Sequence, residues 1–250
     1  MSILKKVFLG LALVTFTATQ SEAQFSDIVK KAESKIKPKN TKSKGSGTLS
    51  ESDISSGLRE ALKVGAQNAT GKVSAPNGFF GNTLIKVLMP PEAQKVENTL
   101  REIGMGSKVD QAILAMNRAA EDASGKALPI FINAIKSMSI QDALSILKGN
   151  NDAATQYLKA KTTAELTTAF RPIIQASLDK VDATKYWAVV FNTYNKLPTT
   201  YNKVNPDLAA YVTERALSGV FLYIAEEEGK IRKDPAAQVT DILKKVFGTH

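Results

Sequence analysis

The sequence predicts an all-α fold: a single globular bundle of about nine or ten helices packed around a buried central helix at about residues 206–232. Three observations support this class. The stretch 216–225 has Ser218 as its only polar side chain, and a helix that is apolar all round is normally buried on all sides. The stretch is also too short to span a bilayer, which needs about 20 residues. Elsewhere apolar residues recur at helical spacing, and no alternating pattern supports a sheet.

The central helix has a well-marked beginning. Asn205 is a good N-cap, Pro206 suits the first helical position, and Asp207 complements the positive end of the helix dipole. Residues 220–225 are rich in β-forming types, so a strand is the alternative, but the charged residues that follow them favour a helix. Gly219 is unfavourable inside a helix, and we expect it to let another helix approach closely.

The remaining helices are predicted from caps, terminators and apolar spacing. In the first half of the domain, Ser52 or Asp53 caps a helix that ends near Gly71, Pro91 begins a helix that stops at Gly104, and Ser107 caps the next helix. A further helix carries Phe131, and a capping box at Ser139 and Asp142 begins a helix that Gly149 ends. In the second half, Asn151 or Asp152 caps a short helix, a capping box at Thr162 and Glu165 begins another, and two more are predicted over 184–197 and from Asp234. Pro172 predicts a kink near Phe170 in the helix after Thr162.

The N-terminal residues predict export. Lys5 and Lys6 form a positive region, residues 7–18 an apolar region, and Ala23 ends a small-x-small cleavage signal, which together are typical of a signal peptide over 1–23. A buried N-terminal helix is the alternative. We expect a periplasmic or secreted protein that is cut after Ala23 and that, since no Cys follows, is not a lipoprotein. Residues 24–47 then form a Lys-rich flexible arm or linker, and residues 48–250 an all-helical domain.

The positive charge is concentrated in the arm. The chain has a net charge of +9, and residues 24–47 contribute seven lysines against two acids, a net +5. Such composition is typical of a solvated linker, and weak contact with an anionic membrane is the alternative. Nucleic acid is not expected as a partner, because no aromatic residue interleaves the lysines of residues 29–47, as stacking on single strands requires.

The residue content excludes several catalytic classes. The chain has no Cys, and its single His is the last residue, His250, which excludes Ser-His and Cys-His nucleophiles and His-based zinc sites. It also lacks a phosphate-cradling glycine loop and an EF-hand loop. We therefore expect neither a metal nor a cofactor, and carboxylates, Lys, Tyr, Ser and Arg are what is left for catalysis.

Two groups before the central helix supply candidate binding residues. Asn117, Arg118 and Glu121 lie on one predicted helix, where Arg118 can reach Glu121 at the i+3 position. We expect an ordinary surface ion pair beside a satisfied Asn, with a binding role as the alternative. Phe79 and Phe80 lie between glycines, and they either plug the core, which we expect, or line a pocket.

The central helix adds three candidates. Tyr211 and Arg215 lie on one stripe, and Glu226 is expected to be partly buried near the end of the helix. Because a buried Arg keeps its charge, it needs a carboxylate beside it, and we predict that Arg215 pairs with Glu121 or Glu226. Trp187, on the preceding helix, is a candidate for contact with an apolar ligand.

Several stretches of the chain also carry a family resemblance. They are MNRAAEDA (116–123), PIFINAI (129–135), DALSILKG (142–149), ATQYL (154–158), ATKYW (183–187), YNKLP (194–198), NPDLAAYVT (205–213) and AEEEGKIRKDPAAQVTDILKKVFG (225–248). On these residues the chain resembles a family of exported bacterial proteins, domain-of-unknown-function family 4197, over roughly residues 54–248. The resemblance implies an exported, helical, single-domain protein, and it implies no activity, ligand or catalytic residue.

Two functional hypotheses follow. The first is a non-enzymatic binding protein of the cell envelope, with an envelope protein or an apolar ligand as its partner. The second is a hydrolase-type enzyme that uses Glu121, Glu226 and Arg215, without a metal or a His. An apolar cavity beside Phe79 and Phe80 would favour the first, and a polar cleft where the charges converge would favour the second.

Overall fold

A computed structural model describes residues 50–196 and 203–233, all of which belong to one compact unit, Thr48–His250. Within these ranges the regular structure is helical, with helices α2 to α9, one 3-10 helix and no strand, so the predicted all-α class is confirmed. The proposed signal peptide, the Lys-rich arm and the last expected helix, which Asp234 begins, lie outside the described residues.

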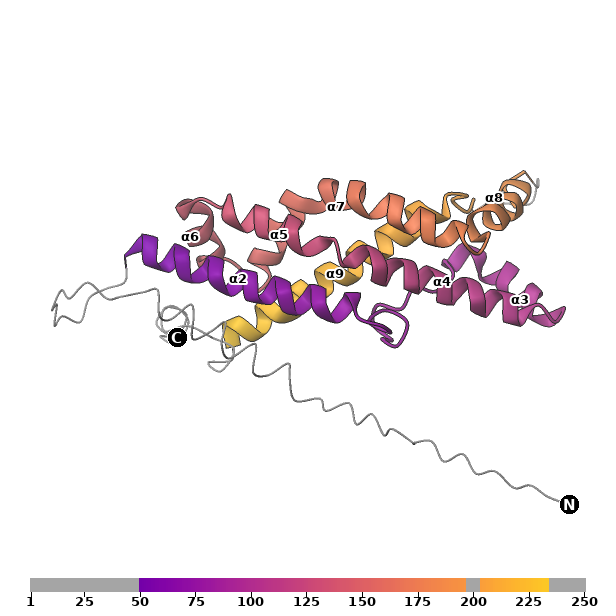
Figure 1. The fold of residues 1–250 in the computed structure, drawn as a ribbon, viewed down its shortest axis with the longest axis horizontal. Coiled ribbons are helices and arrows are strands. Elements are labelled where there is room, and N and C mark those ends of the chain that lie inside the picture. Colours follow the sequence, from indigo (N-terminus) through magenta and orange to yellow (C-terminus); the bar gives the residue numbers. More distant parts are fainter. Residues whose placement is uncertain (1–49, 197–202, 234–250) are drawn as a thin grey trace, which may run out of the picture. The chain divides into compact units, whose positions relative to one another are not determined.

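The bundle is built around α9 (Leu208–Lys233). This helix packs against α2 (Glu51–Ser74), α4 (Gly106–Ser124), α7 (Ala153–Asp179) and α8 (Ala183–Tyr194), and Figure 1 shows it passing between α2 and α7. By length and composition α9 could cross a membrane, but a buried core helix passes the same test. Its contacts with four other helices show that it is the predicted central helix.

The start of α9 differs from the prediction by two residues. Asp207 is the N-cap, because its Oδ1 accepts a hydrogen bond of 2.9 Å from the backbone N–H of Ala210. The side chain of Asn205 instead accepts from the N–H of Asp207 at 2.9 Å, which forms a turn before the helix. Arg171 of α7 also donates to the Asp207 carboxylate, so the cap is tied to a neighbouring helix.

The capping box predicted before α6 is present. The short helices of the described part are η1 (Pro91–Ala93), α3 (Gln94–Glu102), α5 (Ala127–Lys136) and α6 (Ile140–Lys148). Before α6, the N–H of Asp142 donates to Ser139 Oγ at 3.0 Å, and the N–H of Ser139 donates to Asp142 Oδ2 at 2.9 Å. Gly149 is the C-cap of α6, as predicted.

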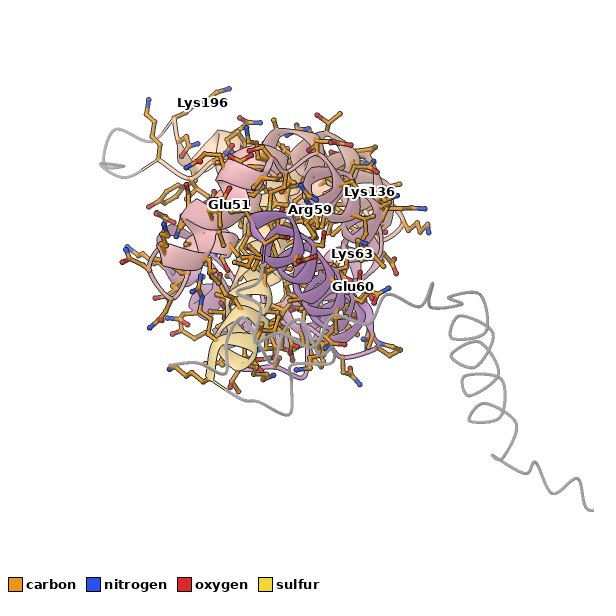
Figure 2. The ribbon with its side chains drawn as sticks, turned by 90° about the vertical axis from the view of Figure 1, so that its left-hand side faces the viewer. Glu51, Arg59, Glu60, Lys63, Lys136 and Lys196 are labelled. Atoms are coloured by element: carbon orange, nitrogen blue, oxygen red, sulfur yellow. The ribbon has the colours of Figure 1, made fainter. Side chains whose placement is uncertain are left out.

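The helix α2 also begins with a capping box, two residues before the first of the two predicted caps. Ser50 is its cap and Asp53 its partner, with Asp53 N–H donating to Ser50 Oγ at 3.2 Å. A cap at Ser52 or Asp53 was therefore wrong, since Asp53 occupies the third helical position of the capping box. Figure 2 looks along the bundle from the end at which α2 begins, and it labels Arg59 on this helix. Arg59 donates to the backbone oxygen of Met138 at 2.6 Å, which ties α2 to the residues before α6.

Two expected helices are one continuous helix. The capping box predicted at Thr162 and Glu165 does not form, because both residues lie inside α7. The hydroxyl of Thr162 donates to the carbonyl of Leu158 at 2.7 Å, which is how Thr is accommodated inside a helix. Pro172 lies inside α7, as predicted, and the kink near Phe170 stays a prediction.

The amphipathic pattern of α8 places two of its aromatic residues inward. Trp187 and Phe191 are buried, and their ring centroids are 4.3 Å apart. The indole N–H of Trp187 donates to the backbone oxygen of Asn205 at 3.0 Å, so α8 is tied to the residues that lead into α9. Trp187 is therefore part of the core rather than a free ligand-binding group.

Candidate functional site

The candidate site is built on an irregular segment between α2 and η1. Residues 79–88, here called the inter-helix segment, lie between α4 and α9. On the α4 side, its start contacts Glu121 and its end contacts Asn117. On the α9 side, its start contacts Tyr223 and its end contacts Tyr211. The segment therefore runs antiparallel to both helices.

Glu121 fixes the start of the segment. It is 4% exposed, and its Oε1 accepts hydrogen bonds from the backbone N–H groups of Phe79 and Phe80, both at 3.1 Å. Its Oε2 accepts from Arg118 Nη1 at 2.6 Å, and Arg118 Nη2 donates to Asn77 Oδ1 at 2.8 Å. The predicted contact between Arg118 and Glu121 is present, but it is not a surface pair. It neutralises a buried carboxylate whose charge would otherwise be costly.

Asn117 fixes the end of the segment. Its side chain is fully buried, and its amide pairs with both backbone groups of Val87. Nδ2 donates to the carbonyl of Val87 at 2.8 Å, and Oδ1 accepts from the N–H of Val87 at 2.8 Å. Nδ2 also donates to the carbonyl of Ile113 at 2.7 Å. Among the described residues, Val87 has no neighbouring strand to pair with. The side chain of Asn117 supplies the donor and the acceptor that such a strand would provide.

The two adjacent phenylalanines have different roles. Phe79 is fully buried and lies against Gly219 of α9, where a Cβ would be 2.6 Å from Phe79 Cε1 and 3.3 Å from Ile85 Cβ. Phe79 is thus the expected core plug. A close approach was predicted at Gly219, but a ring from the inter-helix segment makes it rather than another helix. Phe80 is half-buried, with Lys86 Nζ 4.1 Å from its ring centroid.

The outer face of the segment is apolar. Leu84 is 79% exposed and Leu88 is 54% exposed. Leu222 of α9 is 46% exposed. Tyr211, also on α9, is half-buried and donates its hydroxyl to the carbonyl of Leu88 at 2.8 Å, and burial raises its pKa. A fixed backbone therefore presents two leucines to solvent.

An open cleft of about 600 Å³ lies beside the start of the segment. It is lined by the end of α2, the turn over residues 75–84 and Tyr223. Lys72, Asn77 and Asn82 contribute polar groups beside Leu84. This mixed lining is neither the apolar cavity nor the cleft of converging charges that would have separated the two hypotheses.

The prediction of a buried pair at Arg215 is wrong. Arg215 is exposed, and its hydrogen bond is to Ser218 Oγ at 3.5 Å. It forms no ion pair with Glu121, Glu226 or any other acid of the described residues. The inter-helix segment covers Gly219 but leaves the neighbouring position 215 open to solvent, so the Arg charge stays hydrated.

The buried acids near the end of α9 are Glu227 and Glu228 rather than Glu226. Glu226 is exposed and pairs with Lys230 at 2.6 Å and Lys72 at 3.6 Å. Glu227 is 6% exposed and accepts from Asn68, Lys72 and Lys230 at 2.8–3.0 Å. Burial alone would raise the pKa of Glu227, but these donors outweigh it and the pKa is lowered.

Glu228 caps a helix other than its own. Its carboxylate accepts from the N–H groups of Ala154 at 3.0 Å and Thr155 at 2.8 Å, and from the Thr155 hydroxyl at 2.8 Å. The N-cap of α7, Asp152, makes no side-chain capping bond. Glu228 therefore satisfies the first turn of α7, and Arg232 pairs with it at 2.9 Å. The sequence offered no local signal for this contact, because 73 or more residues separate Glu228 from the groups it caps.

The polar groups identified from the sequence divide into two sets. Asn117, Arg118 and Glu121 converge on the inter-helix segment, and Tyr211 joins it at its other end. Arg215 and Glu226 make separate surface contacts. Within residues 50–196 and 203–233 there is no group of three His, Cys, Asp or Glu side chains that could hold a metal ion. The arrangement orders backbone and balances buried charge, and it brings no acid and base together in a cleft.

Comparisons with known proteins identify the family of the chain. Residues 48–248 match the family model described as a protein of unknown function, DUF4197, so the chain belongs to this family. No curated protein and no solved structure matches the chain.

Proposed function

We propose that this member of the family is a non-enzymatic binding protein of the cell envelope, and that it recognises its partner with the outer face of the inter-helix segment. The observation that carries the proposal is the fixing of an irregular segment by buried polar groups. Glu121 and Asn117 together make five hydrogen bonds to the segment's backbone and to the flanking Arg118. Binding residues commonly lie on loops that a rigid scaffold positions.

The exposed chemistry of this surface indicates the kind of partner. Leu84 and Leu88 are exposed on a fixed backbone, so a partner that covers them loses little backbone freedom on binding. Lys86 lies between them in the segment, and neither Lys86 nor Arg215 of α9 forms an ion pair among the described residues. A partner with apolar groups flanked by negative charge suits this surface.

The alternative, an enzyme built on Glu121, Glu226 and Arg215, has weaker support. Both oxygens of Glu121 are occupied by backbone N–H groups and Arg118. Glu226 pairs with two lysines, and Arg215 faces solvent. These groups would have to meet around one substrate to act as acid, base and anion binder, and their contacts keep them apart.

Site-specific photocrosslinking tests the binding surface. A photoreactive amino acid is placed at position 84, at position 88 or, as a control, at Ala160, which is exposed on α7. In the native cells, we expect one defined product, with a protein or an apolar molecule, from positions 84 and 88 and not from position 160. No product from positions 84 and 88, or the same products from all three positions, would contradict the proposed surface.

The envelope location is a separate part of the proposal. It rests on the signal peptide expected over residues 1–23. Release of the mature protein from the periplasm, with Gln24 as its first residue, is the expected result of fractionation and N-terminal sequencing. Retention in the cytoplasm of protein with an intact N-terminus would contradict export. It would not decide whether the binding surface exists, which the crosslinking experiment tests separately.

A further inference from the structure

The outward face of α8 is unusually apolar for a helix at the edge of a bundle. Trp187 and Phe191 fill its inward face. On the other sides, Tyr186 is 63% exposed, Val189 is 62% exposed and Val190 is 39% exposed. A helix that packs on one side normally presents polar residues on the other. Figure 1 places α8 at the end of the bundle opposite the start of α2.

Lysines flank this apolar face, and α8 itself contains no Asp or Glu, although its exposed N-cap is Asp182. Lys185 and Lys196 are exposed, and at 100° per residue they fall within about 40° of Val189 around the helix axis. From residue 183 to residue 206 the sequence contains three lysines and no Asp or Glu. The third, Lys203, is also exposed. The α8 face is therefore apolar at its centre, and the charged residues around it carry a net positive charge.

We propose that the α8 face docks the protein on an anionic lipid surface. Short apolar side chains enter the headgroup boundary, a Tyr ring suits that interface, and Lys side chains reach anionic headgroups. A second copy of the chain is a poorer occupant. In a two-fold contact the lysines of one copy would meet those of the other, and Asp182 alone could not neutralise them. Because three exposed apolar residues bury little area, docking is reversible and depends on the headgroup charge.

A fluorescent probe at one position tests this directly. The chain has no Cys, so Val189→Cys and, as a control, Ala160→Cys on α7 each give a single labelling site for an environment-sensitive dye. The labelled mature chains are mixed with vesicles of phosphatidylcholine alone or with added phosphatidylglycerol. We expect a blue shift at position 189 with the anionic vesicles, none at position 160, and reversal in about 1 M salt, where charges are screened within about 3 Å.

The design separates α8 from the Lys-rich arm. If residues 24–47 alone carried the protein to vesicles, the protein would cosediment with them and the dye at position 189 would not shift, which would overturn the proposal. A blue shift that needs no vesicles and grows with protein concentration would show self-association instead. A dye already shifted at low concentration would show that other residues of the chain cover α8.

Charge-matched variants provide a second measurement. Lys185→Gln with Lys196→Gln is compared with Lys136→Gln and Lys159→Gln, two exposed lysines on α5 and α7. Both double variants lose the same charge. We expect about thirtyfold weaker partition to anionic vesicles for the first pair, from about fivefold per lysine near a surface. Equal weakening by the two pairs would contradict a specific role for α8.

Discussion

Gly219 in the middle of α9 lies against the ring of Phe79, where a Cβ at position 219 would be 2.6 Å from Cε1 and 2.9 Å from Cζ. The ring is fully buried, so it cannot move aside without displacing other core residues. This contact links the central helix to the inter-helix segment. Glu121 secures the same residue from the other side through its backbone N–H.

Gly219→Ala should destabilise the protein although Ala is the better helix former. Overpacking of a core contact typically costs about 1–3 kcal/mol, which outweighs the gain of up to about 1 kcal/mol in helix propensity. Gly229→Ala in the same helix is the control, because it meets no atom within 4 Å, and it should stabilise. Urea unfolding measures both. Opposite signs are expected, and a stabilising Gly219→Ala would show that the Phe79 contact is loose.

Glu121→Ala should cost about 2–4 kcal/mol of unfolding free energy. It leaves the N–H groups of Phe79 and Phe80 without their acceptor, at about 1–3 kcal/mol for each buried unsatisfied group. Asp122→Ala, at the exposed neighbouring position, should change the free energy by less than about 0.5 kcal/mol. If the two variants unfold at the same urea concentration, Glu121 does not anchor the segment.

Arg232→Met should destabilise far more than Arg215→Met. The side chain of Arg232 is 13% exposed beside Glu228 at 4%, and breaking a buried pair costs about 3–5 kcal/mol. Arg215 is exposed, and its replacement should cost under about 1 kcal/mol. Adding Glu228→Gln to Arg232→Met should recover part of the loss in a double-mutant cycle. Similar losses for the two Arg variants would refute the assignment of the buried pair.

Acid should weaken the fold partly through Glu227. Its pKa lies below the ordinary value of 4.5 because lysines and Asn68 stabilise the charged form. An acid with a lowered folded-state pKa contributes stability that is complete above its unfolded pKa and is lost as the pH falls through the folded value. Stability should therefore decline below about pH 4.5, and Glu227→Gln should be less stable at neutral pH but decline less. Parallel pH profiles of urea midpoints would exclude this contribution.

Local signals in the sequence predicted local structure well. The capping box at Ser139 and Asp142 and the terminator Gly149 depend on residues close in the chain. A close approach at Gly219 was predicted as well, but Phe79, the residue that makes it, is distant in sequence. Thr162 and Glu165 are an instructive exception. Their capping pattern is overridden because Thr162 can bond within the helix to Leu158, and Leu158, Leu166 and Phe170 are buried along one continuous α7.

The sequence could not predict which side chains of α9 are buried and which are exposed. The run 216–225 is apolar on all sides, so it contains no periodicity that identifies its outward stripe. Leu222 is exposed and Glu228 is buried, and each successive residue turns by about 100°. The prediction chose Glu226 as the buried acid on the stripe of Leu222, and that stripe faces outward. The partners of Glu228 and Phe79 are distant in sequence, and only the packed bundle brings them together.

Amide hydrogen exchange tests most directly whether buried polar groups fix the inter-helix segment. The N–H groups of Phe79, Phe80 and Val87 should exchange about as slowly as buried amides of α4, because each donates to a buried side chain. In Glu121→Ala, protection should fall at Phe79 and Phe80 and persist at Val87, which Asn117 holds. Exchange of all three at the rate of an unstructured peptide in the wild-type protein would contradict the account.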